Sequence, residues 1–306
     1  MSISLRQLQY FLVLSEELHF GRAAKRLHIS QPPLSAGLRQ LEEELGVKLL
    51  DRDSKGTRLT SAGVIYAERI AKILGQLESA RVAISNVVGG KEGNLAVGFL
   101  PSMVFRNITQ VLTTFVDEYP KLNLQIDELN STRQLDAIER HTLDVGFIHA
   151  MPLPDGINSH VLERERFVCC LPRGHRLVTR SRISLRELSG EKILMASRRD
   201  AVHYHDQLAA LLRSAGLEPY SDYRLQHWFT KLVLVGQGLG VSVVPQSLSR
   251  SKIASDHVVF IELEEERAYH ELLLVWREND IAEPSSPVAQ FITHVMSYYL
   301  EFGTFR

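Results

Sequence analysis

The sequence has little of what several other protein classes need. Its only two cysteines in 306 residues are neighbours, Cys169 and Cys170. A disulfide between adjacent cysteines would be strained, and two thiols alone provide neither a sulfur-only metal site nor a redox switch between distant cysteines. We therefore expect two buried thiols in a strand. No uninterrupted apolar run approaches the roughly 18 residues that a membrane-spanning helix needs.

The N-terminus lacks the basic and apolar segments of a secretory signal, so we expect a cytoplasmic protein that meets no membrane. The length suggests about two domains. The net charge of -1 does not favour nucleic-acid binding, but its distribution is uneven. Residues 1–90 carry 12 basic and 9 acidic side chains, against 23 and 27 in the remainder. This mild asymmetry permits a DNA-binding N-terminal domain without requiring one.

Two helices are predicted at the start of the chain. Ser4 and Gln7 form a capping-box pattern, which begins a helix over residues 5–18 with an apolar stripe. A shorter helix over residues 21–27 carries two alanines that allow close packing.

A third helix follows at once. Ser30 can cap it, and Pro32 and Pro33 fall in its first turn, where proline is tolerated. Leucines recur along one stripe until Gly46 ends the helix.

The opposite face of this third helix presents Gln31, Ser35 and Arg39, which are residue types that bind base edges and phosphates. Two helices joined by a short turn are typical of a helix-turn-helix. Residues 47–60 then predict a hairpin wing whose Arg52, Lys55 and Arg58 would reach phosphates. The alternative is an ordinary three-helix bundle with solvated polar side chains.

Three stretches of this region closely resemble the LysR-type transcriptional regulators: AAKRLHISQPPLS at 23–35, LEEELGVKLLDR at 41–52 and LTSAG at 59–63. The family usually carries Arg-Gln after the serine at 35, whereas this chain has Ala36 and Gly37, which removes a DNA contact and leaves the operator preference open. The resemblance implies an all-α winged helix-turn-helix over 1–60. The candidate DNA-binding residues are Arg22, Ser30, Gln31, Pro32, Pro33, Ser35, Arg39, Arg52, Lys55 and Arg58.

Residues 61–88 contain no proline and predict one long linker helix, followed by a glycine-rich hinge near residue 90. Apolar residues alternate at spacings of four and three, which is typical of a coiled-coil seam. We expect a homodimer held by Tyr66, Ile70, Ile73, Leu77 and Ile84, and the resemblance extends this to a homotetramer. The alternative is a helix that packs on its own domain.

Strand and helix patterns alternate from residue 91 to the end. Strands at 95–99, 122–126 and 143–148 are separated by helices at 103–119 and 132–141, which indicates a parallel sheet. A second series runs from a strand at 167–171 to a helix at 288–300. We therefore expect two sheets in two Rossmann-like α/β lobes. The family resemblance implies an effector domain similar to periplasmic binding proteins of type II, with lobe 1 near 91–165 and 270–306 and lobe 2 near 166–269.

Ligands of α/β folds lie beyond the carboxyl ends of strands, and helix N-termini there suit a carboxylate. The candidate effector-binding residues are Ser102, Met103, Ser131, Thr132, Phe147, His149, Arg198, His203 and Gln226. For the hydroxyl groups, the alternative is an ordinary N-cap, and for the histidines it is a structural role. Arg199 competes with Arg198 as the partner of a carboxylate.

The sequence contains no complete catalytic motif. The segment at 203–205 has two histidines but no third metal ligand, and GQGLG at 236–240 precedes a strand and lacks the last glycine of a dinucleotide loop. We therefore expect that the protein is not an enzyme and that it binds neither a metal nor a cofactor. We expect a regulator whose partners are double-stranded DNA, RNA polymerase and a small-molecule effector. The N-terminal DNA-binding region, called the head below, loosely resembles regulators of aromatic-compound catabolism. A solute-binding protein and an enzyme with a DNA-binding head are the alternatives.

Overall fold

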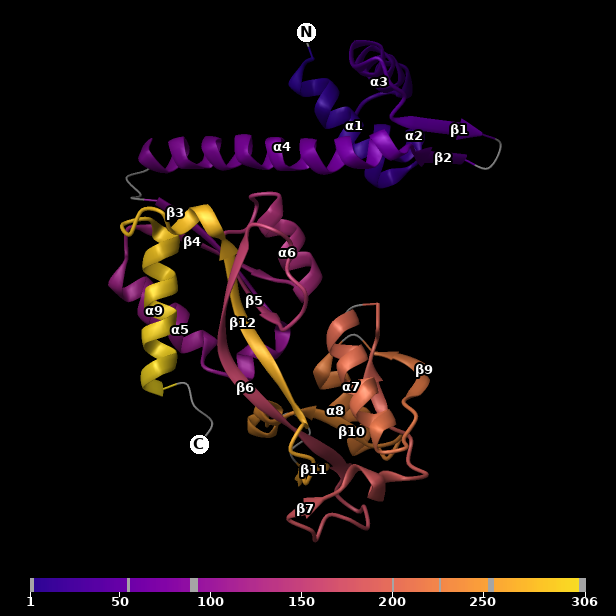
Figure 1. The fold of residues 1–306 in the computed structure, drawn as a ribbon, viewed down its shortest axis with the longest axis vertical. Helices are drawn as coiled ribbons and strands as arrows, with labels where there is room; N and C mark the ends of the chain where they lie inside the picture. Colours follow the sequence, from indigo (N-terminus) through magenta and orange to yellow (C-terminus); the bar gives the residue numbers. More distant parts are fainter. Residues whose placement is uncertain are drawn as a thin grey trace. The chain divides into compact units, whose positions relative to one another are not determined.

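The computed structural model describes residues 3–53, 56–88, 93–199, 201–225, 227–252 and 256–302. The chain divides into two compact units, the first made of residues 1–84 and 140–142 and the second of residues 85–139 and 143–306. Figure 1 shows the N-terminal unit in indigo and violet and the C-terminal unit from magenta to yellow.

The N-terminal unit begins with three helices, α1 (Leu5–Glu17), α2 (Phe20–Arg26) and α3 (Gln31–Leu45). The capping box of Ser4 and Gln7 is confirmed, and α3 ends at Gly46 in the left-handed conformation, with φ of 67°. Ser30 occupies the N-cap of α3, but its side chain makes no capping hydrogen bond, so that expectation is wrong. A capping hydroxyl accepts an N–H from the second or third helical residue, and here both are prolines.

A single apolar core holds the three helices together. Leu34, Leu38 and Leu41 of α3 are buried against Phe11 and Leu14 of α1. The glycine inside α3 has a packing reason. A Cβ atom at Gly37 would lie 3.0 Å from the ring of Tyr10, so glycine lets α1 and α3 approach closely.

The wing is an antiparallel pair, β1 (Leu50–Asp53) and β2 (Gly56–Leu59). The buried carboxylate of Glu42 attaches it to α3, accepting the N–H groups of Leu49 at 2.8 Å and Leu50 at 3.2 Å and a bond from Lys48 at 2.9 Å. Burial alone raises the pKa of Glu42, but these donors outweigh it and lower the pKa. One ionised side chain therefore fixes the start of the wing.

The linker helix α4 (Ser61–Val88) forms as predicted, but its apolar seam divides into two parts. Ile70 is buried in the core of the head, and the half-buried ring of Tyr66 lies 5.5 Å from Phe11. For these two residues the alternative of packing on the own domain holds. Ile73 and Leu77 are 48% and 46% exposed. No described helix, α4 included, combines the length and apolarity required to cross a membrane.

The first lobe of the C-terminal unit has the predicted parallel strands β3 (Gly93–Phe99), β4 (Leu122–Glu128) and β5 (Val145–His149). Helices α5 (Ile108–Glu118) and α9 (Pro287–Phe302) share a core on one face of the sheet, and α6 (Ser131–Glu139) packs on the other (Figure 1).

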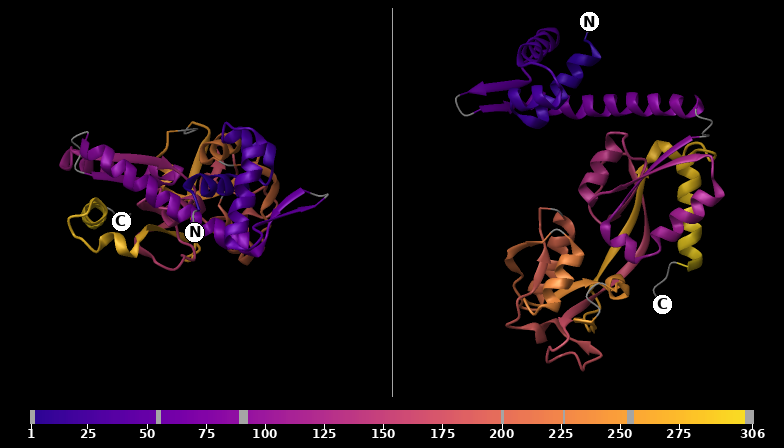
Figure 2. Two further views of the ribbon diagram at one scale, coloured as in Figure 1. Left: turned by 90° about the horizontal axis from the view of Figure 1, so that it is seen from above. Right: turned by 180° about the vertical axis from the view of Figure 1, so that it is seen from behind.

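The expectation of two separate sheets is wrong. Among the described residues, one eight-stranded sheet joins both lobes, because β6 (Ile157–Pro172) and β12 (Tyr269–Arg277) are long antiparallel strands (Figure 2). The partners of β6 change after Arg166, from β12 to β10 (Ser242–Pro245) and β11 (Val258–Leu263). The strand β6 therefore belongs to both parts of the sheet.

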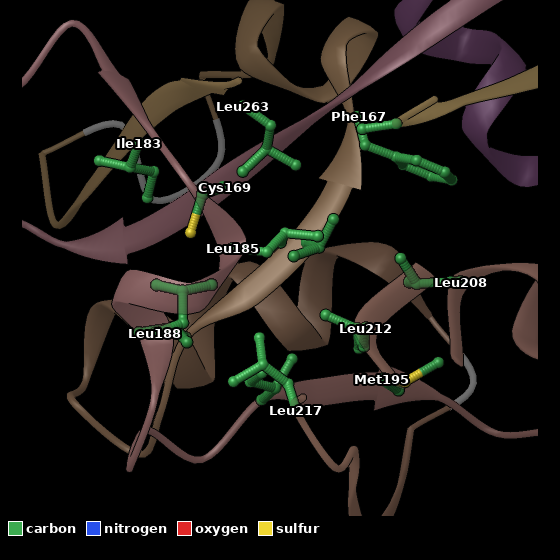
Figure 3. Close-up of a cluster of buried hydrophobic side chains, with 14 of the residues drawn as sticks. Phe167, Cys169, Ile183, Leu185, Leu188, Met195, Leu208, Leu212, Leu217 and Leu263 are labelled. Carbon is green, nitrogen blue, oxygen red and sulfur yellow. The ribbon is translucent and has the colours of Figure 1, made fainter. Parts of the chain in front are cut away.

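The second lobe packs helices and short strands on the distal part of β6. Cys169 and Cys170 are free and buried on opposite faces of that strand, as expected. Figure 3 shows the larger of the two cores, in which Cys169 lies among leucines. The remaining elements of this lobe are β7 (Arg182–Ile183), η2 (Leu185–Leu188), β8 (Leu194–Ala196), α7 (Val202–Ser214), β9 (Tyr220–Leu225), α8 (Trp228–Gly236) and η3 (Gln246–Arg250). The short η4 (Glu278–Ile281) follows β12 in the first lobe.

The single helix predicted over 103–119 is also wrong. A short 3-10 helix, η1 (Pro101–Phe105), precedes α5, and the chain is extended at Arg106 between them, with φ of -113° and ψ of -166°. The break accompanies the burial of Arg106, whose guanidinium reaches the carboxylate of Glu165 on β6. A long-range ion pair thus overrides the local helical pattern.

Candidate DNA-binding surface and effector site

Helices α2 and α3 form a helix-turn-helix whose turn is residues 27–30, with His28 at a positive φ of 55°. The leucine stripe of α3 faces the core, so its other face is open. Gln31, Pro32, Pro33 and Arg39 are exposed on that face, and Ser35 is half-buried. The structure therefore brings together the base-reading candidates of the third helix.

The wing continues this surface. Ser35 and Arg39 line a groove of about 410 Å³ together with Lys48 and Asp51 at the start of the wing. Arg58 is exposed, with its Nε 3.8 Å from a carboxylate oxygen of Asp51. Of the remaining wing candidates, Lys55 and the side chain of Arg52 lie outside the described residues.

Arg22 differs from the other candidates because its guanidinium already has partners within the head. It donates to the carboxylate of Glu17 at 3.2 Å and to the backbone carbonyl of the same residue. An exposed ion pair of this kind is worth little in stability, so a phosphate can replace the carboxylate at small cost.

In the C-terminal unit, the carboxyl ends of β4, β3 and β5 meet at one edge of the parallel sheet. The N–H of Leu129 donates to the carbonyl of Phe99 at 3.1 Å, which places the start of α6 beside the end of β3. The hydroxyl of Ser131 accepts the backbone N–H of His149 at 3.1 Å, which joins α6 to the end of β5. Ser102, Ser131 and His149 therefore belong to one edge.

The hydroxyl groups at this edge are not N-caps, which was their alternative role. Asn130 caps α6, because its side-chain oxygen accepts the N–H of Arg133 at 2.9 Å. Ser102 is completely buried, and its hydroxyl has no hydrogen-bond partner among the described residues. Thr132 is exposed in the first turn of α6. A buried hydroxyl without a partner is costly, which is typical of a binding site.

Several effector candidates lie elsewhere. Met103 and Phe147 are buried in the core of the first lobe, where Phe147 packs edge to face on Phe291. Arg198 is exposed and forms a bidentate ion pair with Asp206, with bonds of 2.7 and 2.8 Å. His203 is exposed, and Gln226 lies outside the described residues.

Tyr204, rather than its neighbour His203, faces the first lobe from α7. Its buried ring lies 4.6 Å from that of His149 and 5.3 Å from that of Trp228 at the start of α8. Sequence analysis missed it, although Tyr204, Leu208 and Leu212 form the inner stripe of α7. That spacing of four was a usable signal.

A buried ionic cluster at the lobe boundary was also missed. The carboxylate of Glu165 binds the guanidinium of Arg106, the N–H of Ser247 and the ring of His270. Burial alone raises the pKa of Glu165, but these partners outweigh it and lower the pKa to about 2. Burial raises the pKa of Glu163, 3.9 Å from Arg106, to about 7. Glu165 is thus the permanent anion of the cluster.

Lys231 of α8 is a second buried cation, 1% exposed. Its Nζ lies 3.5 Å from the centre of the Trp228 ring and has no hydrogen-bond partner among the described residues. Burial lowers its pKa from 10.5 to about 7.

Two sequence families match this chain. Residues 5–64 match the bacterial regulatory helix-turn-helix proteins of the lysR family, and residues 89–299 match the LysR substrate binding domain. The chain belongs to the LysR family. The HTH-type transcriptional regulator YnfL of Escherichia coli (strain K12) is 33% identical to it, over 97% of this chain and 99% of that protein. CatR of Pseudomonas putida is 30% identical, over 94% and 96%.

Solved structures agree. CbnR, a LysR family transcriptional regulator, superposes with a TM-score of 0.68 at 25% identity, over 97% of this chain and 99% of that one. Full-length BenM, at a TM-score of 0.59 and 24% identity, supports the fold. The LysR-type regulator thus combines a DNA-binding helix-turn-helix with an effector-binding domain of two α/β lobes, which confirms the predicted fold class and function.

Proposed function

We propose that this regulator reads operator DNA with the exposed face of α3 and the wing. The observation that supports the proposal best is the exposure of Gln31 and Arg39 on a helix whose other face is core. Glutamine and arginine bind base edges bidentately in the major groove. In a dimer, two such helices would enter successive major grooves, with Arg58 near the phosphate backbone.

Replacing Arg39 by alanine should weaken binding to a duplex taken from beside the regulator's own gene by about 10- to 100-fold, since a base contact is worth ~1–3 kcal/mol. Fluorescence anisotropy at two salt concentrations measures the affinity. Lys25, which is exposed on α2 and not on α3, offers a control: Lys25→Ala should change the affinity less than Arg39→Ala. Equal losses would contradict the assignment of α3 as the reader.

We propose that the effector is a small carboxylate bound at the edge that holds Ser102, Ser131, Thr132 and His149. The support is the buried hydroxyl of Ser102, which has no hydrogen-bond partner in the described part of the chain and belongs to the same sheet edge as the N-terminus of α6 with its positive dipole end. Metabolites of aromatic-compound catabolism are the candidates we favour, because the head resembles regulators of such pathways. We also propose that the domains and lobes of the protein have the boundaries predicted from the sequence.

Replacing Ser102 by alanine should weaken effector binding by about tenfold, the value of one lost hydrogen bond. Stability should not fall, because the hydroxyl has no hydrogen bond to any described residue. The measurement is the affinity for the most stabilising acid from a thermal-shift screen of small carboxylic and aromatic acids. Thr132→Ala should likewise reduce the response to that acid while sparing DNA binding. If both variants lost DNA affinity as Arg39→Ala does, the division of labour would be wrong.

We propose that α4 forms a homodimer through Ile73, Leu77 and Ile84, and that dimers pair into tetramers. Ile84 is 69% exposed, and the three residues continue the heptad beyond the part that packs on the head. Leu77→Glu should raise the dimer dissociation constant by at least about 100-fold, equivalent to ~3 kcal/mol for an unpaired charge in an apolar interface. Sedimentation equilibrium measures it.

The control for this variant is Ile65→Glu, since Ile65 is 61% exposed on α4 but lies off the seam. Its dissociation constant should stay near that of the parent. Equal weakening by both glutamates, or by neither, would remove α4 as the dimer interface.

In the proposed mechanism, an effector between the lobes favours one lobe arrangement. This changes the spacing of the two α3 helices of the dimer and the contact with RNA polymerase. The ligand must bind that arrangement better than the other, because tight binding alone shifts nothing. We propose that the protein acts in the cytoplasm, where operator DNA lies, and that it catalyses no reaction.

A further inference from the structure

Two histidines and a glutamate form a hydrogen-bonded chain across the lobe boundary. His270 of β12 lies between the other two residues. Its Nε2 is 3.1 Å from the carboxylate of Glu165 on β6, and its Nδ1 is 3.2 Å from Nδ1 of His149 at the end of β5. All three side chains are buried.

The proton positions in this chain follow from the charge at its inner end. Glu165 is ionised, because Arg106 and the N–H of Ser247 bind the same carboxylate. An ionised carboxylate only accepts hydrogen bonds. Nε2 of His270 therefore carries a hydrogen and donates it to Glu165.

Both imidazoles are neutral, since burial lowers the pKa of His149 and of His270 below their ordinary value. A neutral imidazole holds one proton. Because the proton of His270 is on Nε2, its Nδ1 can only accept, so Nδ1 of His149 must donate. This fixes the tautomer of His149 and leaves a lone pair on its Nε2.

This lone pair belongs to a residue of the proposed effector edge, where the other polar groups can donate. The backbone N–H of His149 binds the oxygen of Ser131, which leaves the hydroxyl hydrogen of Ser131 free to donate. The hydroxyl of Ser102 has no hydrogen-bond partner within the described ranges of the chain. His149 itself has no further hydrogen bond among the described residues, beyond those of its backbone and Nδ1.

We infer that His149 selects for an effector that carries a hydrogen-bond donor, a hydroxyl or an amino group, beside its carboxylate. The inference rests on the proposed function of this edge as a carboxylate site. The carboxylate would face the serine hydroxyls and the start of α6, and the donor would face Nε2 of His149. An acid without a donor at that place covers the lone pair of Nε2 without pairing it, and an ether oxygen there is repelled by it.

Matched pairs of acids test the inference on the full-length protein. The probes are the 2-, 3- and 4-hydroxybenzoates with the corresponding methoxybenzoates, benzoate itself, and lactate with propionate, titrated calorimetrically. At least one hydroxy acid should bind about tenfold or more tightly than its methoxy or unsubstituted partner. Binding of acids without such a preference overturns the inference but leaves the carboxylate site standing. No binding by any acid overturns the proposed effector class and the inference with it.

Two further measurements keep the test independent of any one variant. His149→Phe, which preserves a ring against Tyr204, should bring the hydroxy acid and its partner to similar affinities. The control His160→Phe changes an exposed histidine of β6 and should retain the preference. In protein labelled with ¹⁵N-histidine, NMR should show Nε2 of His149 unprotonated and Nε2 of His270 protonated. The opposite tautomer of His149 would overturn the inference whatever the ligands show.

Discussion

Replacing Lys231 by methionine should raise the free energy of unfolding of the C-terminal unit at pH 7 by on the order of 3 kcal/mol. The side chain is buried without a hydrogen-bond partner among the residues that the structure describes, and burial lowers its pKa from 10.5 to about 7. Folding therefore weakens the binding of the proton to this amine, which lowers the free energy of unfolding at any pH where the unfolded chain keeps Lys231 protonated. Methionine fills a similar volume and loses only the contact of Nζ with the Trp228 ring. Urea unfolding measures the gain.

The sign of the pH dependence gives a sharper test. Between pH 7 and 10.5 the unfolded state binds more protons at Lys231 than the folded state, so the stability of the parent rises with pH over this window. The advantage of Lys231→Met should be largest at pH 7 and shrink towards pH 10. Both tryptophans, Trp228 and Trp276, lie in the C-terminal unit, so their fluorescence follows its unfolding.

The control is Lys252→Met, which changes an exposed lysine of the same lobe and should alter stability little at either pH. A gain for Lys231→Met that is equal at pH 7 and pH 9.5 would show that the effect comes from packing alone. A loss of stability at pH 7 would show that the ammonium has an anionic partner in solution.

The head could be predicted almost completely, because its signals are local. Ser4 with Gln7, the leucine stripe of α3 and Gly46 each act within one or two turns of helix. The two errors there also have local causes. The proline pair removes the N–H groups that Ser30 would bind. The first turns of α4 directly follow the wing, so Tyr66 and Ile70 pack in the core of the N-terminal unit instead of continuing the dimer seam.

The C-terminal unit was less predictable because its decisive contacts join distant parts of the chain. The middle of β6 contains Glu163 and Glu165, charges that argue against a buried strand. The strand tolerates Glu165 there because Arg106, 59 residues earlier, and His270, 105 residues later, bind its carboxylate. The same pair interrupts the helix predicted around Arg106.

The candidate effector site could be located but not completed. Strand ends and helix starts are local features, so the sequence selects Ser102, Ser131 and His149 as candidate effector contacts, and the structure places all three at one sheet edge. Arg198 was chosen for its charge, yet the nearby Asp206 on α7 binds it at the surface. The contributions of Tyr204 and His270 depend on how the second lobe packs against the first, which no spacing within one segment reveals.

Replacing Arg106 by methionine should destabilise the C-terminal unit by about 3–5 kcal/mol, the largest loss we expect from a single substitution. Its guanidinium is the only cation that directly contacts the carboxylate of Glu165 among the described residues, and both side chains are buried. Without it, Glu165 must either remain an anion with two neutral donors or take up a proton. Urea unfolding at pH 7, followed by tryptophan fluorescence, measures the loss.

A double variant separates the loss of charge pairing from the loss of packing. Arg106→Met combined with Glu165→Gln removes both charges. The amide oxygen can still accept the N–H of Ser247, and the amide NH2 can donate to Nε2 of His270 once that ring carries its proton on Nδ1, so the double variant should recover at least about 1 kcal/mol of the single-variant loss. The pKa of Glu165 is about 2 in the parent, below its ordinary value, so the contribution of this carboxylate is present above pH 4.5 and is lost towards pH 2. Acid should therefore shift the balance from the parent towards the double variant. If the double variant is less stable than the single one at pH 7, the cluster contributes through hydrogen-bond geometry that glutamine cannot reproduce, and not through the compensation of a buried charge.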